Sequence, residues 1–254
     1  MGIPKLIQIL ADMGSPESIG RQGENGISRK LAWSNFFGRK GLLLRNIYIP
    51  KQNGGTSEID LLYITEKGIF VIESKNYFGY VFGSEDSTNW TVTLYAGKDF
   101  WGRKKIEKHK FYNPIMQNAS HVKQLLNFLH EAFPTYSIIV FSDRCRLMDF
   151  TWHTPNIFVC KKCELNGIIA RIWGQRPSCL SDDQVQGIYT RLLPLTNAAA
   201  EVKQQHVADI QKQMETCPVC GGRLVLRTAK RGNNVGGQFY GCSNYPRCKF
   251  TRSI

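Results

Sequence analysis

The chain has 254 residues, and 42% of them are hydrophobic, which is enough for a buried core and argues against wholesale disorder. No apolar run approaches the roughly 18 to 20 residues that a membrane span needs, and the N-terminal segment shows no secretory signal, so we expect a cytoplasmic protein with no membrane attachment. The net charge of +13 favours a polyanionic partner. It is unevenly placed, because residues 217–254 contain seven Lys or Arg and no Asp or Glu.

The first predicted element is a helix that starts at Ser15-Pro16, where proline is tolerated in the first turn, and reaches Gly38. Its apolar residues at roughly helical spacing are Ile27, Leu31, Trp33, Phe36 and Phe37. Four strands are expected next, at 42–49, 58–65, 68–75 and 90–95, with a short turn around Glu66-Lys67-Gly68 joining the second strand to the third.

A second helix is expected to open at Asn113-Pro114 and to continue towards Pro134. The fully apolar run 137–141 is typical of a central buried strand, and further helices are expected at 164–173 and 181–193. The pattern predicts an α/β domain with a mixed sheet over residues 1–196. A polar, helix-favouring stretch at 197–216 is predicted to be a linker helix, followed by a cysteine-rich module at 217–254.

That module contains four of the eight cysteines, as two close pairs: Cys217 with Cys220, and Cys242 with Cys248. Four thiolates so arranged suit a closed tetrahedral structural Zn²⁺ site, and Gly221-Gly222 matches the tight knuckle of such sites. RLVLRTA and QFYGC are expected to form two strands joined by GNNVGG. Because a segment this small buries little apolar surface, we expect it to need the metal for folding.

The residues around the cysteines are of the two types, basic and aromatic, that commonly contact nucleic acid. Basic side chains are available for phosphate contacts: Arg223, Arg227, Lys230, Arg231, Arg247, Lys249 and Arg252. Aromatic side chains are available for stacking on unpaired bases, although one or two of them are expected to form the small core of the module instead: Phe239, Tyr240, Tyr245 and Phe250. The segment CPVCGGRLVLRTAKRGNNVGGQFYGCSNYPRCKFT resembles the four-cysteine zinc finger repeated at the C-terminus of bacterial type IA topoisomerases. This resemblance implies binding of single-stranded DNA.

An acidic constellation lies in the first domain. Glu73 and Lys75 are two residues apart on a predicted strand and therefore share a face, and the preceding strand brings Asp60 beside them. Two carboxylates suit a hard cation such as Mg²⁺ or Mn²⁺, and a neighbouring lysine can orient a water or steady the charge on a phosphate. The alternative is an ordinary salt bridge at a strand end, since Glu-x-Lys is a common triplet.

Three further residues are candidates for the same site. Glu24 follows Gly23 in the first helix, and we expect it to reach a metal held between Asp60 and Glu73. Gln117 and His121 are four residues apart on the second helix and share one face, from which they can position a phosphate or a water. A lone histidine is more often a surface or core residue than a catalytic one.

The segments GENG, EIDLLYI, GIFVIESKNYFG and NPIMQN, in this order, resemble the nuclease-related domain family, a branch of the PD-(D/E)xK nuclease superfamily. The resemblance covers most of residues 15–195. It implies a restriction-endonuclease-like α/β fold, with a mixed sheet flanked by helices, and catalytic positions at Glu24, Asp60, Glu73 and Lys75, with Gln117 in support. The expected acidic residues are all present, and Ser74 occupies a freely variable position.

Two other signals stay open. Cys145, Cys160, Cys163 and Cys179 could bind a second metal, but we favour small buried thiols at Cys145 and Cys160, which lie beside apolar runs. The basic run around Arg103, Lys104, Lys105, Lys108 and Lys110 is either a solvated face or a guide for DNA.

The sequence therefore predicts a Mg²⁺- or Mn²⁺-dependent deoxyribonuclease, directed to single-stranded DNA by a C-terminal zinc ribbon. Asp60 and Glu73 are the expected metal ligands, and Lys75 is expected to assist the attacking water. The alternative is a DNA-binding or DNA-end-sensing adaptor that uses a nuclease-like fold without cutting.

Overall fold

The computed structural model describes residues 16–36, 38–51, 54–98, 102–196, 204, 208–209, 212, 214–229 and 235–253. The chain divides into two compact units, with the division between Asn197 and Ala198. The predicted linker helix at 197–216 lies largely outside the described residues, and it stays a prediction.

The centre of the first unit is a five-stranded mixed sheet in the order β1-β2-β3-β7-β9. Strands β1 (Gly41–Pro50), β2 (Thr56–Thr65) and β3 (Gly68–Lys75) pair antiparallel. Strands β7 (Thr135–Phe141) and β9 (Ile157–Lys161) then continue the sheet in parallel with β3. The run at 137–141 is thus a buried interior strand, as its uninterrupted apolar sequence predicted.

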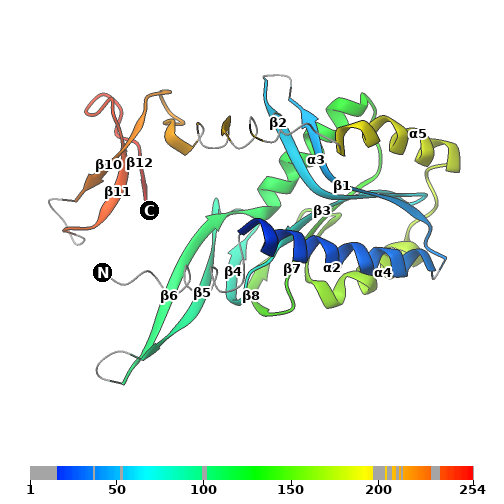
Figure 1. Cartoon of the computed structure of the whole chain (residues 1–254), viewed down its shortest axis with the longest axis horizontal. Helices are drawn as coiled ribbons and strands as arrows, with labels where there is room; N and C mark the ends of the chain where they lie inside the picture. The colour runs from blue at the N-terminus through cyan, green and yellow to red at the C-terminus, as the bar shows by residue number, and fades with distance from the viewer. Residues whose placement is uncertain are drawn as a thin grey trace. The chain divides into compact units, whose positions relative to one another are not determined.

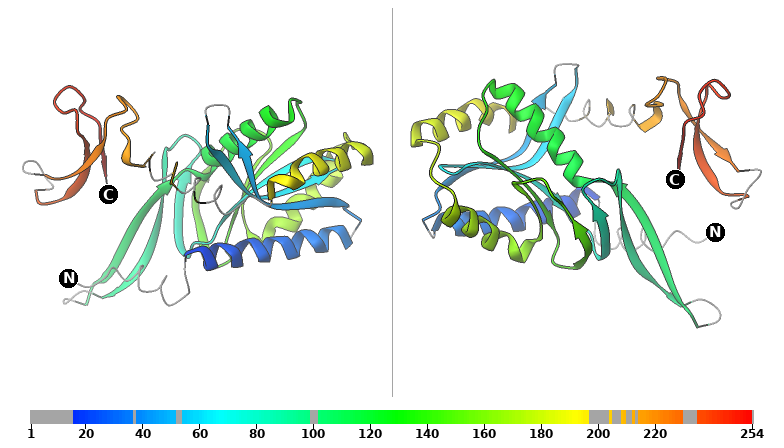
Figure 2. Two further views of the ribbon diagram at one scale, coloured as in Figure 1. Left: turned by 45° about the horizontal axis from the view of Figure 1, so that its top comes forward. Right: turned by 180° about the vertical axis from the view of Figure 1, so that it is seen from behind.

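Two pairs of helices cover the two faces of this sheet (Figure 2). Helices α2 (Pro16–Phe36) and α4 (Leu165–Gln175) pack on the face to which Leu61 and Tyr63 point. Helices α3 (Pro114–Leu129) and α5 (Asp182–Leu192) pack on the face that carries Leu62 and Ile64. Neighbouring residues of β2 therefore enter different cores, as the alternation of side chains along a strand requires. The short helices η1 (Lys162–Glu164) and η2 (Leu193–Thr196) complete these layers.

A second, four-stranded sheet in the order β6-β5-β4-β8 extends the first unit (Figure 1). Its strands are β4 (Gly79–Ser84), β5 (Asn89–Lys98), β6 (Lys104–Tyr112) and β8 (Cys145–Thr151). Trp90 of β5 is fully buried and stacks on Phe141 of β7, with ring centroids 6.0 Å apart. This contact fixes the second sheet against the edge of the first core, while the β5–β6 hairpin extends beyond it.

The α/β class and the mixed sheet flanked by helices are confirmed, and some details differ. Helix α3 ends at Leu129 because His130 adopts a left-handed conformation with φ of 56°, short of Pro134. Ile27 and Leu31 are buried as expected, whereas Trp33 is exposed. The basic run ending at Lys110 is strand β6, which the sequence analysis did not predict. None of the helices in the described part of the chain combines the length and apolarity that membrane crossing requires.

The second unit is a small antiparallel sheet in the order β10-β11-β12. Strands β10 (Leu224–Thr228) and β11 (Gln238–Cys242) correspond to the two predicted strands, and β12 (Thr251–Ser253) adds a third. Three cysteines of this unit, Cys217, Cys242 and Cys248, lie in its hydrophobic cluster, and a fourth, Cys220, is exposed beside them, which makes it a three-stranded four-cysteine unit.

Candidate functional site

Asp60 and Glu73 lie beside each other where the β2–β3 ladder ends. The last pair of that ladder is Leu61 with Ile72, so the next residues outward on the two strands are Asp60 and Glu73. One carboxylate oxygen of Asp60 accepts a hydrogen bond from the backbone N–H of Ser74 at 2.7 Å. The short hairpin thus brings the two acidic residues together, as the sequence analysis anticipated.

Glu73 and Lys75 point towards α3. The carboxylate of Glu73 is only 3% exposed, and its Oε1 lies 2.7 Å from Nζ of Lys75. The same ammonium group donates a second hydrogen bond, to Oε1 of Gln117 at 3.0 Å. The three side chains therefore form one chain of contacts from β3 to α3.

His121 contacts this group from the next turn of α3. Its Nε2 lies 3.5 Å from Oε2 of Glu73, and its Nδ1 is hydrogen-bonded to Oγ of Ser57 at 2.7 Å. Glu73 is thus approached by Lys75 on one oxygen and by His121 on the other. The four-residue spacing from Gln117 made His121 a candidate in the sequence, but no catalytic role was assigned to it there, because a lone histidine is more often a surface or core residue.

Glu24 approaches from the α2 side of the sheet. Its carboxylate lies 3.5 Å from the guanidinium of Arg45 in β1. Helix α2 approaches β3 closely beside it: a Cβ atom on Gly23 would lie 3.0 Å from Oγ of Ser74, so a side chain there would require the hydroxyl to shift. Glu24 influences Asp60 electrostatically, more weakly than Glu73 does.

The regular alternation of β1 and β2 is interrupted beside the site. Leu44 and Ile47 of β1 both enter the core under α3 and α5 although they are three residues apart, and Ile59 and Leu62 of β2 do the same. Between the first two, Asn46 has a φ of 50°, a conformation uncommon for a residue with a side chain, and its side chain is hydrogen-bonded to Glu24. The sheet is therefore locally distorted where the acidic residues gather, a feature that sites under functional constraint often show.

The pKa values of the two acidic residues at this site are shifted in opposite directions. Burial and then the negative charge of Glu73 raise the pKa of Asp60 well above its ordinary value. Burial also acts to raise the pKa of Glu73, but hydrogen bonding to His121 and the charge of Lys75 lower it overall. Burial opposes the charge on Lys75, yet Glu73 raises its pKa above the usual value. The negative charge of Glu73 is thus offset by its neighbours, whereas that of Asp60 is offset only in part, by the N–H of Ser74 and the charge of Lys75.

A hard divalent cation fits this donor set, because its charge would relieve the repulsion at Asp60 and because carboxylate oxygens are its preferred ligands. Such a cation takes one or two carboxylates and fills its other positions with water.

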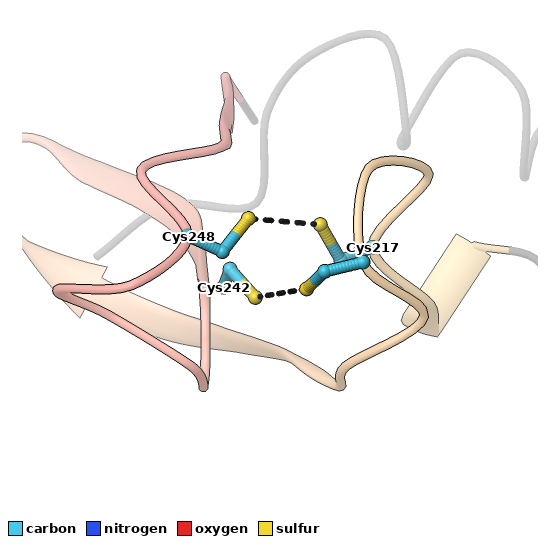
Figure 3. A group of neighbouring side chains, drawn as sticks. Cys217, Cys242 and Cys248 are labelled. Carbon is cyan, nitrogen blue, oxygen red and sulfur yellow. Dashed lines mark hydrogen bonds between the residues drawn. The ribbon is translucent and has the colours of Figure 1, made fainter.

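The four predicted zinc cysteines converge in the second unit, and Figure 3 labels three of them, Cys217, Cys242 and Cys248. Their sulfur atoms all lie within 4.8 Å of one another, with Cys217 to Cys248 at 3.7 Å and Cys220 to Cys242 at 3.3 Å. Tetrahedral zinc with bonds of ~2.3 Å requires sulfurs about 3.8 Å apart, so the cluster fits a structural Zn²⁺. The backbone N–H of Gly222 lowers the pKa of Cys220 to about 6, which favours the thiolate that zinc binds.

The nucleic-acid candidates of this unit separate into two groups. Tyr245 is exposed beside the guanidinium of Arg227, 5.7 Å from its ring, and Arg223, Arg247 and Lys249 are also exposed or partly so. Tyr240 and Phe250, in contrast, pack against the cysteine cluster, in keeping with the expectation that one or two aromatics form the small core. Phe239 is half-buried. Lys230 and Arg231 lie outside the described residues, as do the first three residues, 232–234, of the GNNVGG turn.

The other cysteines are distributed differently. Cys145 and Cys160 are buried, as expected for small apolar-like side chains, and burial raises the pKa of the Cys145 thiol to about 11. Cys163 and Cys179 are exposed. Within the described ranges, the zinc cluster is the one group of three or more Cys, His, Asp or Glu ligand atoms gathered within 4.8 Å.

Comparison with known proteins finds a matching family model in each of the two units. The model of the nuclease-related domain matches residues 19–142, and that of the topoisomerase DNA-binding C4 zinc finger matches residues 214–254. An uncharacterized protein of Bacillus anthracis is 28% identical over 208 residues, covering 80% of this chain and 91% of that protein.

The zinc unit has relatives of its own. It is 48% identical over 46 residues to DNA topoisomerase 1 of Methanocaldococcus jannaschii, and 57% identical over 35 residues to that of Archaeoglobus fulgidus. These matches cover 18% and 14% of this chain, and only 5% of each topoisomerase, so the likeness concerns the zinc finger alone. No solved structure matches the chain. The chain therefore contains a nuclease-related domain, matched over residues 19–142, followed by a topoisomerase-type C4 zinc finger, matched over residues 214–254.

Proposed function

We propose that the protein is a metal-dependent deoxyribonuclease whose zinc unit holds DNA, preferentially where it is single-stranded. The observation that carries the proposal is the position of the Lys75 ammonium. It is hydrogen-bonded to both Glu73 and Gln117, beside the partly buried carboxylate of Asp60, whose pKa is raised by desolvation and by the charge of Glu73. Two carboxylates with a lysine at the end of one strand pair form a set suited to phosphodiester hydrolysis.

Each side chain has a role in this proposal. Asp60 and Glu73 would hold Mg²⁺ or Mn²⁺, which supplies positive charge to a phosphate as negative charge develops on it. Lys75 orients the attacking water or stabilises the phosphate, and Gln117 keeps the ammonium in place. Glu24 adds negative charge on the α2 side, where Arg45 limits its repulsion with Asp60.

The zinc unit supports the choice of DNA. Its family description is that of a DNA-binding zinc finger, and its described surface carries exposed Arg and Lys residues beside the exposed ring of Tyr245. Cations bind the phosphates of any sequence, and an exposed ring stacks on an unpaired base. The same features do not require cleavage, so an adaptor that binds DNA without cutting it is the competing function.

An assay with labelled single-stranded, duplex and nicked DNA tests the proposal. Wild type, Lys75→Ala and Lys123→Ala are purified in parallel and incubated with Mg²⁺, Mn²⁺ or no added divalent metal. Lys123 is an exposed lysine of α3 and serves as the matched control. We expect metal-dependent cleavage by wild type and Lys123→Ala but not by Lys75→Ala. Tight binding by wild type without cleavage under either metal would favour the adaptor.

A further inference from the structure

The second sheet has one face that its core does not use. Val81, Trp90 and Val92 point inward, into a cluster with Ile139 and Phe141 of β7. Because side chains alternate along a strand, their neighbours point to the opposite side. We call this side the outer face, and the strand pairings assign these residues to it: Tyr80, Phe82, Thr91, Thr93, Tyr95, Ile106, Lys108, Lys110, Tyr112, Arg146 and Met148.

Large aromatic rings stand exposed on the outer face. The exposed fractions are 44% for Tyr80, 36% for Phe82, 60% for Tyr95 and 51% for Tyr112. They come from three neighbouring strands, β4, β5 and β6, rather than from one loop. A face of a sheet that a protein leaves to water usually carries polar side chains, so a group of exposed rings indicates a binding surface.

The charged side chains that the pairings assign to the outer face are all positive; Asp149 of β8, which is exposed, lies in the bulge after Met148 and has no pairing. Lys108 and Lys110 are exposed on β6, and the guanidinium of Arg146 on β8 lies 5.9 Å from the centre of the Tyr80 ring. Among the described residues that the pairings assign to this face, none is acidic. Glu107, the acidic residue of β6, points to the other side, where it lies 3.8 Å from His109.

The register arranges rings and cations in parallel rows. Thr93 is paired with Tyr80 on one side and with Lys108 on the other, and Thr91 is paired in the same way with Phe82 and Lys110. Each row therefore has an aromatic ring, a short threonine and a lysine across three adjacent strands. Successive rows lie roughly 6.6–6.8 Å apart, because alternate residues of a strand share a face.

We propose that the outer face binds single-stranded DNA, with bases stacked on Tyr80, Phe82 and Tyr95 and phosphates in contact with Lys108 and Lys110. Unpaired bases expose the flat surfaces that such rings need, whereas a duplex buries them in its own stack. The positive charge of Lys108, Lys110 and Arg146 complements a phosphate backbone and would repel the same three residues of a second copy of this chain. The proposal deepens the proposed function by adding a second DNA-binding surface, within the nuclease-related domain itself.

Binding of a fluorescein-labelled oligothymidylate to the full-length protein, without added divalent metal, tests this surface. We expect Tyr80→Ala and Tyr95→Ala each to weaken binding about five-fold or more, as loss of one stacked base does. Tyr80→Phe keeps the ring and should bind like wild type. Trp33→Ala, which removes an exposed ring from α2, is the matched control and should also leave the affinity unchanged.

The ionic contacts and the place of binding are tested separately. Lys108→Ala should reduce the slope of log affinity against log salt by about one, whereas Lys123→Ala should not. Photocrosslinking to an oligonucleotide that carries 5-bromouracil should yield adducts on peptides containing Tyr80 or Tyr95.

Several results would overturn the proposal. One is an unchanged affinity for the oligothymidylate in both tyrosine-to-alanine variants. Another is a set of crosslinked adducts confined to residues 217–254. A third is a loss of affinity for duplex DNA, in the tyrosine-to-alanine variants, as large as their loss for single-stranded DNA. Dissociation of a dimer by Tyr80→Ala without loss of oligonucleotide binding would instead identify an interface between copies. Because no cleavage is measured, these results are independent of the Lys75→Ala assay.

Discussion

Oε1 of Gln117 accepts a hydrogen bond from Nζ of Lys75 at 3.0 Å, and this contact joins the end of β3 to the first turn of α3. It orients the ammonium group, whose other partner is Glu73. The helix is itself fixed at this point, because the side chain of Asn113 caps it by accepting from the N–H of Ile115. Gln117 is therefore a positioning residue in the proposed mechanism.

Replacing Gln117 by leucine should slow cleavage without weakening DNA binding. The substitution removes the second acceptor of Lys75, so the ammonium loses its fixed direction, and we expect the cleavage rate at saturating DNA to fall about ten-fold or more. Single-turnover cleavage and the Kd for DNA are measured together. Gln186→Leu, at an exposed position of α5, is the control. A Gln117→Leu protein that cleaves as fast as this control would remove Gln117 from the site.

His121→Ala should weaken the metal dependence of cleavage. His121 and Lys75 each approach one oxygen of Glu73, so loss of the imidazole frees the carboxylate to rotate. Groups that orient a metal ligand in this way typically contribute about 10- to 100-fold in metal affinity. The Mn²⁺ concentration that gives half-maximal cleavage should rise accordingly, and it should stay unchanged in His153→Ala, which removes an exposed histidine. An unaltered Mn²⁺ requirement would leave His121 as a core residue.

Asp60→Asn should abolish cleavage and, without added metal, stabilise the fold at neutral pH. Burial and Glu73 raise the folded-state pKa of Asp60, so folding favours its protonated form. That stabilisation is complete below the unfolded pKa and is lost as the pH rises through the folded pKa. Asparagine stays neutral and still offers an oxygen to the N–H of Ser74. We expect its Tm to exceed that of wild type by a few degrees at pH 8, and the difference to vanish at low pH.

A lower Tm for Asp60→Asn at pH 8 would contradict the raised folded-state pKa of Asp60. Asp182→Asn provides a matched change at the start of α5, where the aspartate is exposed. It should cleave DNA like wild type.

The zinc unit should contain one Zn²⁺ per chain, lost in Cys242→Ser and retained in Cys163→Ser. Cys242 is buried in the cluster of four sulfurs, whereas Cys163 is exposed in the first unit. Without the metal this small sheet has too little core to remain folded, so DNA affinity should fall together with zinc content. Elemental analysis of both variants checks this, and a second zinc per chain that disappears in Cys163→Ser would contradict it.

Local sequence patterns were sufficient to predict the parts of the site that lie close together in the chain. Glu73 and Lys75 share a face because strands alternate, and a tight turn after Thr65 brings Asp60 beside them. Gln117 could be placed by its position in the first turn of a helix that a proline opens. The spacing of the two cysteine pairs likewise predicted that the four thiols gather in one cluster.

What the sequence analysis missed depends on pairing between distant strands. The β4–β8 pair is parallel and joins residues far apart in the chain, so no turn signal announces it. Strand β6 is rich in lysine, which is not typical of strands, and it is a strand because it pairs antiparallel with β5. The distortion at Asn46 was also missed, because Asn46 lies inside the strand expected at 42–49, where no turn signal marks a left-handed residue.

The central claim is that Lys75, held between Glu73 and Gln117, takes part in metal-dependent DNA cleavage. Its most direct test is the single-turnover rate of single-stranded DNA cleavage in Mg²⁺ by wild type and Lys75→Ala, at protein concentrations that saturate the DNA. The account predicts cleavage by wild type and a rate at least about a hundred-fold lower for Lys75→Ala, with equal DNA affinity. Equal rates for the two proteins would contradict it.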